Sequence, residues 1–186
     1  MSRKPMIISV AAVSGGGKTT ITNQLKKRLD NSRALHFDDY EFEESPADIC
    51  KWVEDGADYN EWNLAPFISD IHSILNDHDV HYIILDYPFA YLNSSMSDLI
   101  DLAIFIDTPL DIAMARRMIR DFSDSTLENI QRDVSHYLLR GRPAYLEMDM
   151  SVKPNSDIIL DGTLPPEIIV EQIIKGIREK EKNSIN

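Results

Sequence analysis

The sequence predicts an α/β fold in which helices cover both faces of a parallel sheet. Short apolar runs of the kind that is buried in parallel sheets alternate with amphipathic segments of helical period. A turn of three consecutive glycines, residues 15–17, joins the first apolar run to the first helical segment. Acidic residues follow two of the apolar runs, at Asp38 and Asp86. In open parallel sheets such strand ends share one edge, where ligands bind.

The composition is ordinary for a globular protein. The 186 residues are 43% hydrophobic and 27% charged, and we expect one domain with a sizeable core over residues 1–186. No apolar run approaches the roughly 18 residues that a membrane-spanning helix needs, and the polar start of the chain does not resemble a signal peptide. We therefore expect a cytoplasmic protein with no membrane partner. The lone cysteine, Cys50, agrees with a reducing compartment.

The net charge of the chain is −12. A charge of this sign repels a phosphate backbone over any long contact, so we expect a small-molecule partner and no nucleic acid. A local cluster of positive groups must then exist wherever a polyphosphate binds, because the overall field opposes it. The sequence leaves open whether the chain forms a homo-oligomer.

The glycine turn lies between a predicted strand, residues 6–13, and a predicted helix, residues 18–30. This order is typical of a phosphate-binding loop, in which backbone N–H groups surround the phosphates, a lysine reaches the terminal ones and a threonine hydroxyl binds Mg²⁺. The motif is AxxxxGKT and begins at Ala12, where glycine is commoner. The residues that we expect to bind the phosphates are Ser14, Gly15, Gly16, Gly17, Lys18, Thr19 and Thr20.

A second strand is predicted at residues 34–37 and is followed by a pair of acids, Asp38 and Asp39. The next segment, residues 41–64, is irregular and acidic with interleaved aromatic side chains. It is either a solvated, partly helical insertion or a flap that binds a phosphoryl acceptor, since rings stack on flat ligands and carboxylates accept hydrogen bonds from hydroxyl groups. Its single basic residue is Lys51. The candidate acceptor-binding residues are Asp39, Tyr40, Tyr59, Trp62 and Tyr87.

A helix is predicted from Pro66 to about Asp77, and a third strand at residues 80–85. The strand is a nearly continuous β-branched run that places Asp86 at the carboxyl edge of the sheet. An acid in this position of a phosphate-loop protein holds Mg²⁺ directly or through water. We therefore expect Thr19 and Asp86 to be the magnesium residues.

A fourth strand is predicted at residues 102–106, with Thr108 as the N-cap and Pro109 as the first residue of the following helix. That helix carries three cations on one side, Arg116, Arg117 and Arg120. They are either a solvated face paired with acids such as Asp121 or the positive cluster that the acidic composition requires. Because arginines here can neutralise charge at a transferring phosphoryl group, we expect a lid at about residues 116–128.

Two helices and a strand complete the chain. The capping-box pattern SxxE at Ser125 predicts a helix that ends near Gly141, with Pro143 blocking its extension. A last strand is predicted at residues 157–160. The proline pair that begins at Pro165 opens a final amphipathic helix.

These motifs, in this order, resemble the uridine kinase-like family of P-loop kinases, which includes uridine-cytidine, nicotinamide riboside and phosphoribulose kinases. The likeness covers most of the chain and rests on the segments AVSGGGKTT, HFDDY, IILDYPFAY and ARRMIRDF. It implies a P-loop NTPase fold, a three-layer αβα sandwich with a five-stranded parallel sheet in the order 2-3-1-4-5 and a helical lid. It also implies transfer of the γ-phosphoryl group of ATP, with Mg²⁺, to a hydroxyl group of a small molecule.

The resemblance assigns roles by motif position. Asp38 looks like the family's catalytic base, Asp86 like its magnesium-associated acid, and Arg117 and Arg120 like its lid arginines. With the loop lysine, Lys18, these give the candidate catalytic set. A base in this position orients the attacking hydroxyl and accepts its proton late, so its placement matters more than its basicity.

The resemblance is weakest where the acceptor would bind. Residues 41–63 do not match the family's nucleoside-recognition block, and an arginine-glycine-arginine signature is absent from the segment SDSTLEN. We favour a nucleoside or nucleoside-like acceptor. A nucleoside monophosphate kinase, the alternative, would need basic residues to hold the acceptor's phosphate. A P-loop ATPase or regulatory nucleotide-binding protein without a small-molecule acceptor, and a binding module that has lost activity, remain open.

Overall fold

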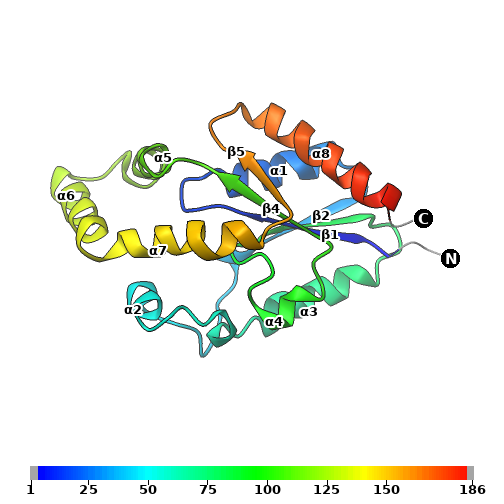
Figure 1. Ribbon diagram of the computed structural model, residues 1–186, viewed down its shortest axis with the longest axis horizontal. Helices are drawn as coiled ribbons and strands as arrows, with labels where there is room; N and C mark the ends of the chain where they lie inside the picture. The colour runs from blue at the N-terminus through cyan, green and yellow to red at the C-terminus, as the bar shows by residue number, and fades with distance from the viewer. Residues whose placement is uncertain (1–3, 184–186) are drawn as a thin grey trace.

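The computed structural model describes residues 4–183 and contains a five-stranded, wholly parallel sheet in the order β2-β3-β1-β4-β5 (Figure 1). The predicted strand order is therefore confirmed. The central strand β1 is fully buried and pairs on one side with β3 and on the other with β4. The strands are β1 (Met6–Ala11), β2 (Ser32–His36), β3 (Tyr82–Asp86), β4 (Leu102–Asp107) and β5 (Ile158–Asp161).

Helices cover both faces of the sheet and make the predicted three layers. On one face, α1 and α8 pack on the sheet through Leu25, Val170 and Ile173, all fully buried (Figure 1). On the other face, α3 contributes Phe67 and Ile71 to a second core cluster. The α-helices are α1 (Lys18–Arg28), α2 (Ile49–Glu54), α3 (Ala65–Leu75), α4 (Ser94–Ser97), α5 (Leu110–Phe122), α6 (Leu127–His136), α7 (Arg142–Glu147) and α8 (Pro166–Asn183).

The predicted cap of α5 is wrong. Thr108 was expected to cap the helix, but the helix begins at Leu110 and its N-cap position is occupied by Pro109. The Thr108 side chain is 3% exposed, and its hydroxyl donates a hydrogen bond to the carbonyl oxygen of Gly16, at 2.9 Å. The hydroxyl therefore binds the glycine turn instead of the first turn of its own helix.

The predicted start of α6 is displaced by one residue. The backbone N–H of Ser125 bonds to the carbonyl of Phe122 and closes the end of α5. The N-cap residue of α6 is Thr126, whose side chain accepts a hydrogen bond from the backbone N–H of Asn129. The capping box expected at Ser125 is therefore wrong in register.

Pro143 does not end the helical structure that begins with α6. Helical structure continues from α6 through a π-helical segment, Tyr137–Gly141, into α7 and a second π-helical segment, Met148–Val152. Gly141 has a right-handed helical backbone, with φ −75°, so it does not form the left-handed cap that ends a helix. Pro143 lies in the first turn of α7, which directly continues the first π-helical segment, so its missing N–H falls within an unbroken helical run.

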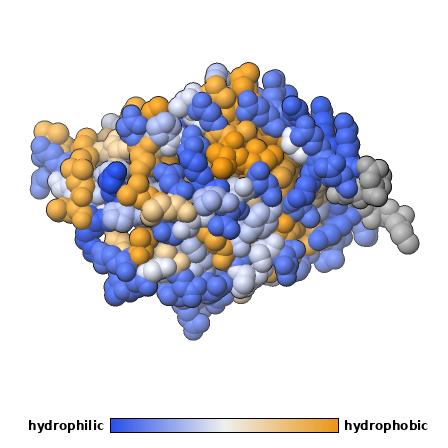
Figure 2. Space-filling model, in the orientation of Figure 1, coloured by the Kyte–Doolittle hydropathy of each residue, from blue (hydrophilic) through white to orange (hydrophobic). Residues whose placement is uncertain are grey.

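The far end of this helical segment is apolar at its surface. Figure 2 shows apolar residues grouped at the end of the molecule that α6 occupies in Figure 1. Leu127, Leu138 and Leu139 are 68%, 70% and 82% exposed. None of the three belongs to either core cluster. Within residues 4–183, no helix is long and apolar enough to cross a membrane.

Candidate active site

The glycine turn adopts the conformation that a phosphate-binding loop requires. Gly15 and Gly17 have φ angles of +80° and +102°, which side chains disfavour. The backbone N–H of Gly16 bonds back to the carbonyl of Val13 at 2.8 Å, and α1 begins directly afterwards at Lys18. The turn therefore places backbone N–H groups and a helix N-terminus around one concavity, where an anion is stabilised.

Two contacts hold the turn against the sheet. A methyl group added at Gly15 would collide with the backbone carbonyl of Ala113 on α5, so only glycine fits there. On the other side, the buried Thr108 hydroxyl donates its hydrogen bond to Gly16. The turn is thus fixed by α5 and by the end of β4.

Lys18 forms an ion pair with Asp86, the last residue of β3. Only 2% of the Asp86 side chain is exposed, and its second oxygen lies 3.1 Å from Nδ1 of His36, at the end of β2. Burial lowers the pKa of the Lys18 amine, the charge of Asp38 acts to raise it, and that of Arg120 lowers it further. Asp86, His36 and Asp38 lie at the ends of the neighbouring strands β3 and β2, and α1 and α5 add Lys18 and Arg120.

The residues that we expect to hold magnesium, Thr19 and Asp86, lie beside the loop, but the two oxygens of Asp86 are engaged by Lys18 and His36, and of the pair only Thr19 lines the cavity described below. The Asp86 carboxylate ends β3, and Thr19 is an exposed residue in the first turn of α1. Mg²⁺ is usually bound by one or two protein oxygens together with substrate phosphates. Within the described part of the chain, no group of three histidine, cysteine, aspartate or glutamate residues could hold a metal without other ligands.

The three arginines of α5 separate in the structure. Arg120 reaches toward the loop, with a guanidinium nitrogen 3.5 Å from the Ser14 hydroxyl, and it also pairs with Asp121. Arg116 donates to the carbonyl of Gly162, after β5, at 3.1 Å. Arg117 is instead bound to Asp133 on α6. Arg116 and Arg120 therefore line the cavity described below, and Arg117 does not.

A cavity of about 970 Å³ extends from the glycine turn to both edges of the sheet. At its centre it is lined by residues 12–21, which include Lys18, and by Asp38. Toward β5 it is lined by Arg116, Gly162 and Leu164. Toward β2 and β3 it opens between residues that follow those strands and residues of α7. A single space therefore joins the loop, the candidate base and two flanking pockets.

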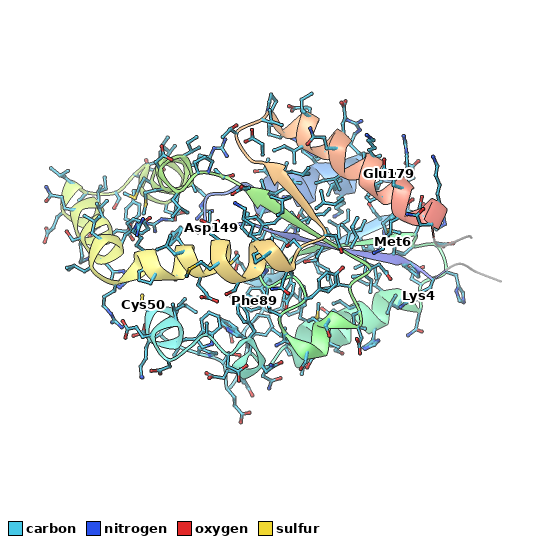
Figure 3. The ribbon with its side chains drawn as sticks, in the orientation of Figure 1. Lys4, Met6, Cys50, Phe89, Asp149 and Glu179 are labelled. Atoms are coloured by element: carbon cyan, nitrogen blue, oxygen red, sulfur yellow. The ribbon has the colours of Figure 1, made fainter. Side chains whose placement is uncertain are left out.

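The pocket beside β2 and β3, which we call the acceptor end, is aromatic. Its rings are those of Phe37, Trp52, Tyr59, Trp62 and Phe89. Figure 3 shows Phe89 between α7 and the flap that carries α2. Ala144, Tyr145 and Glu147 of α7 also line the cavity, as do Met148 of the second π-helical segment, Ile49 and Pro88.

Two of the five candidate acceptor residues line this cavity, Tyr59 and Trp62. Tyr40 donates a hydrogen bond to Asp70 at 2.7 Å, outside the cavity lining. Tyr87 is fully buried and its ring stacks on Phe67 in the core. Asp39 is exposed and absent from the lining. Sequence reasoning missed the cavity-lining residues of α7 and Phe89, and it placed Arg116 in the positive cluster without assigning it to the catalytic set.

No family model matches the chain. Curated proteins do resemble it over most of its length. The uridine kinase of Leuconostoc citreum (strain KM20) is 28% identical, and the alignment covers 86% of this chain and 89% of that protein. The uridine-cytidine kinase B of Dictyostelium discoideum is 25% identical, over 97% of this chain and 86% of its own.

Solved structures share the fold. A sugar kinase from Janibacter sp. HTCC2649 superposes with a TM-score of 0.57 at 19% identity, over 92% of this chain and 93% of its own. A gluconokinase from Sinorhizobium meliloti 1021 has the same TM-score at 14% identity, over 98% and 97% of the two chains. At these identities the likeness concerns the architecture alone.

Proposed function

Because the chain resembles uridine kinases over most of its length, we propose that it is a uridine kinase-like P-loop kinase, which transfers the γ-phosphoryl group of ATP to a hydroxyl group of a nucleoside or nucleoside-like acceptor. The observation that carries the proposal is that Lys18 and Asp38 line one cavity, between a pocket toward β5 and the aromatic acceptor end. ATP would occupy the loop and the β5 side. The acceptor would occupy the aromatic end, with its hydroxyl at Asp38.

The residues present supply the positioning that phosphoryl transfer needs. The glycine turn and Lys18 would bind the phosphates, and Arg120 would stabilise charge on the transferring group. Asp38 would orient the acceptor hydroxyl and accept its proton. Thr19 and Asp86 would hold Mg²⁺ once Lys18 had moved from Asp86 to the phosphates, and the ion would neutralise charge on the phosphate oxygens. Arg117 would act on the reaction only if it exchanged Asp133 for the phosphates.

A nucleoside monophosphate kinase is less well supported. Such an enzyme needs cations that hold the phosphate of the acceptor. The cations that line the cavity are Lys18, Arg116 and Arg120, and all belong to the loop or to α5. The two bases near the flap are engaged elsewhere, Lys51 with Asp55 and Arg140 with Asp48.

The proposal is tested by ADP release in the presence of a panel of nucleosides, nucleotides, sugars and vitamins. We expect ADP release to depend on an acceptor with a free hydroxyl group and a planar ring. Release at the same rate without any acceptor would instead identify an ATPase. ATP binding without any release would identify a binding module.

Replacement of the candidate base, Asp38, distinguishes an effect on kcat from an effect on the affinity for ATP. We expect Asp38→Asn to lower kcat by about 10²-fold or more, because the amide cannot accept the proton, with the affinity for ATP nearly unchanged. Lys18→Ala should remove activity with every acceptor. Asp79→Asn, an exposed acid before β3, is the matched control and should leave kcat unchanged. Loss of ATP binding in Asp38→Asn would contradict the role assigned to Asp38.

A further inference from the structure

The aromatic rings at the acceptor end form one continuous wall. Phe89 lies at its centre, with ring centroids 5.1 Å from Trp62, 5.2 Å from Tyr59 and 5.4 Å from Phe37. Trp52 extends the wall through an edge-on contact with Tyr59, at 5.1 Å. Phe37, Trp52, Tyr59 and Phe89 are largely buried against one another, at 6–8% exposed, so only the part of the wall that lines the cavity offers apolar contact to a planar ring, and it does not distinguish one ring from another.

The charge at this end is entirely negative among the residues that line it. The carboxylates of Glu147 and Asp38 face the cavity, whereas its cations, Lys18, Arg116 and Arg120, lie on the loop and on α5. Asp38 lies at the centre of the cavity, where its charge acts on the pKa of both Lys18 and Arg120, so Glu147 is the acid that an acceptor at this end meets without a cation among the lining residues. A positive charge or an N–H donor on the ligand is stabilised there, and a phosphate is repelled.

Glu147 is placed and oriented by the flap. Its Oε1 accepts a hydrogen bond from the Tyr59 hydroxyl at 3.1 Å, which joins α7 to the segment after α2. Burial raises the pKa of Tyr59, and the negative charge of Glu147 raises it further. The Tyr59 hydroxyl therefore stays protonated and continues to donate its hydrogen bond. The contact uses Oε1, and a carboxylate can accept further hydrogen bonds on both oxygens.

We propose that Glu147 determines which acceptor the enzyme takes: a phosphate-free molecule with a planar ring that is cationic or bears an N–H donor. The inference rests on the proposed function and assigns specificity within the same site. The ring would stack on the aromatic wall, and the carboxylate would contact its positive or N–H edge. Anionic acceptors would be excluded by charge.

The two tryptophans of the chain, Trp52 and Trp62, both line the acceptor end, so intrinsic fluorescence reports binding there without ATP. The probes are nicotinamide riboside with a cationic ring, uridine with a neutral ring and an N–H donor, and uridine 5′-monophosphate. For the wild type we expect the monophosphate to bind at least about tenfold more weakly than uridine. In Glu147→Gln, the ratio of the affinities for nicotinamide riboside and the monophosphate should fall by about tenfold or more.

Matched variants separate charge from shape. Glu147→Asp keeps the charge and should keep the preference for the cation over the monophosphate, and Glu171→Gln, an exposed residue of α8, should leave the ratio unchanged. An unchanged ratio in a folded Glu147→Gln protein would overturn the inference. Two results with the wild type would also overturn the inference. One is binding of the monophosphate that is as tight as that of uridine or tighter, and the other is the absence of tryptophan quenching by any of the three probes. Because these titrations need no turnover, acceptor-dependent ADP release tests the proposed function separately.

Discussion

At the scale of single residues, the site depends on groups that lie far apart in the sequence. Thr108 and Gly16 are 92 positions apart, yet the Thr108 hydroxyl donates to the Gly16 carbonyl inside the protein. The capping prediction for Thr108 considered only its own helix, where a threonine before a proline is a plausible cap. A partner across the sheet is set by tertiary packing, which local patterns do not reveal.

Thr108→Val should destabilise the protein by about 1 kcal/mol and raise KM for ATP, because the buried Gly16 carbonyl loses its donor. Thr22→Val is the matched control: Thr22 is also fully buried, but its hydroxyl has no hydrogen-bond partner. That change should leave the stability equal or higher. Chemical denaturation and ATP kinetics measure both effects, and equal losses in the two variants would show that the Thr108 hydrogen bond contributes nothing.

At the scale of elements, the helical spacing predicted that the arginines of α5 share one side but not which of them meets the cavity. Residues three and four apart are neighbours, yet the rotation of the helix against the sheet decides where each side chain points. Here the fully buried Ala113 faces the glycine turn and fixes that rotation. Arg116 and Arg120 consequently reach the cavity, and Arg117 reaches α6.

Substitution of each arginine by methionine, which keeps much of the side-chain volume, should distinguish these roles. Arg120→Met should lower kcat by about 10²-fold or more, because charge on the transferring group loses its partner. Arg117→Met should mainly lower the thermal stability, because Asp133 on α6 loses its ion pair. Melting temperatures and single-turnover rates measure the two effects. A larger loss of transfer rate in Arg117→Met would show that Arg117 leaves Asp133 during the reaction.

The long helical segment after the lid was the least predictable element. Pro143 is a strong stop signal in sequence, and its position within a helix became clear only from the π-helical segment before it. Residues Tyr145 and Glu147 enter the cavity because the helix continues. Its exposed contacts with the flap, such as Arg140 with Asp48 at 3.4 Å, add little to stability but bring the two elements together over the acceptor end.

At the scale of the whole molecule, the sequence patterns predicted the strands and the loop, and the resemblance to the kinase family implied the sheet order, whereas the acceptor end was predicted less well. The loop is a continuous motif whose geometry is largely local, and strands that are buried on both faces are nearly continuous apolar runs. The acceptor end combines the flap, the end of β3 and α7. Tyr59 and Tyr87 look alike in sequence and belong to the same core cluster, but Tyr59, at 7% exposed, lines the cavity, whereas Tyr87, at 0% exposed, does not.

The continuity of the cavity from β5 to the flap has a consequence for inhibition. One compound that links adenosine through a polyphosphate chain to a cationic or neutral planar nucleoside would fill both ends at once. Such a bisubstrate compound should bind about 10²-fold or more tightly than either half, since the second half binds at a high effective concentration. It should compete with ATP and with the acceptor in steady-state inhibition. Competition with ATP alone would mean that one molecule cannot occupy the glycine turn and the acceptor end at the same time.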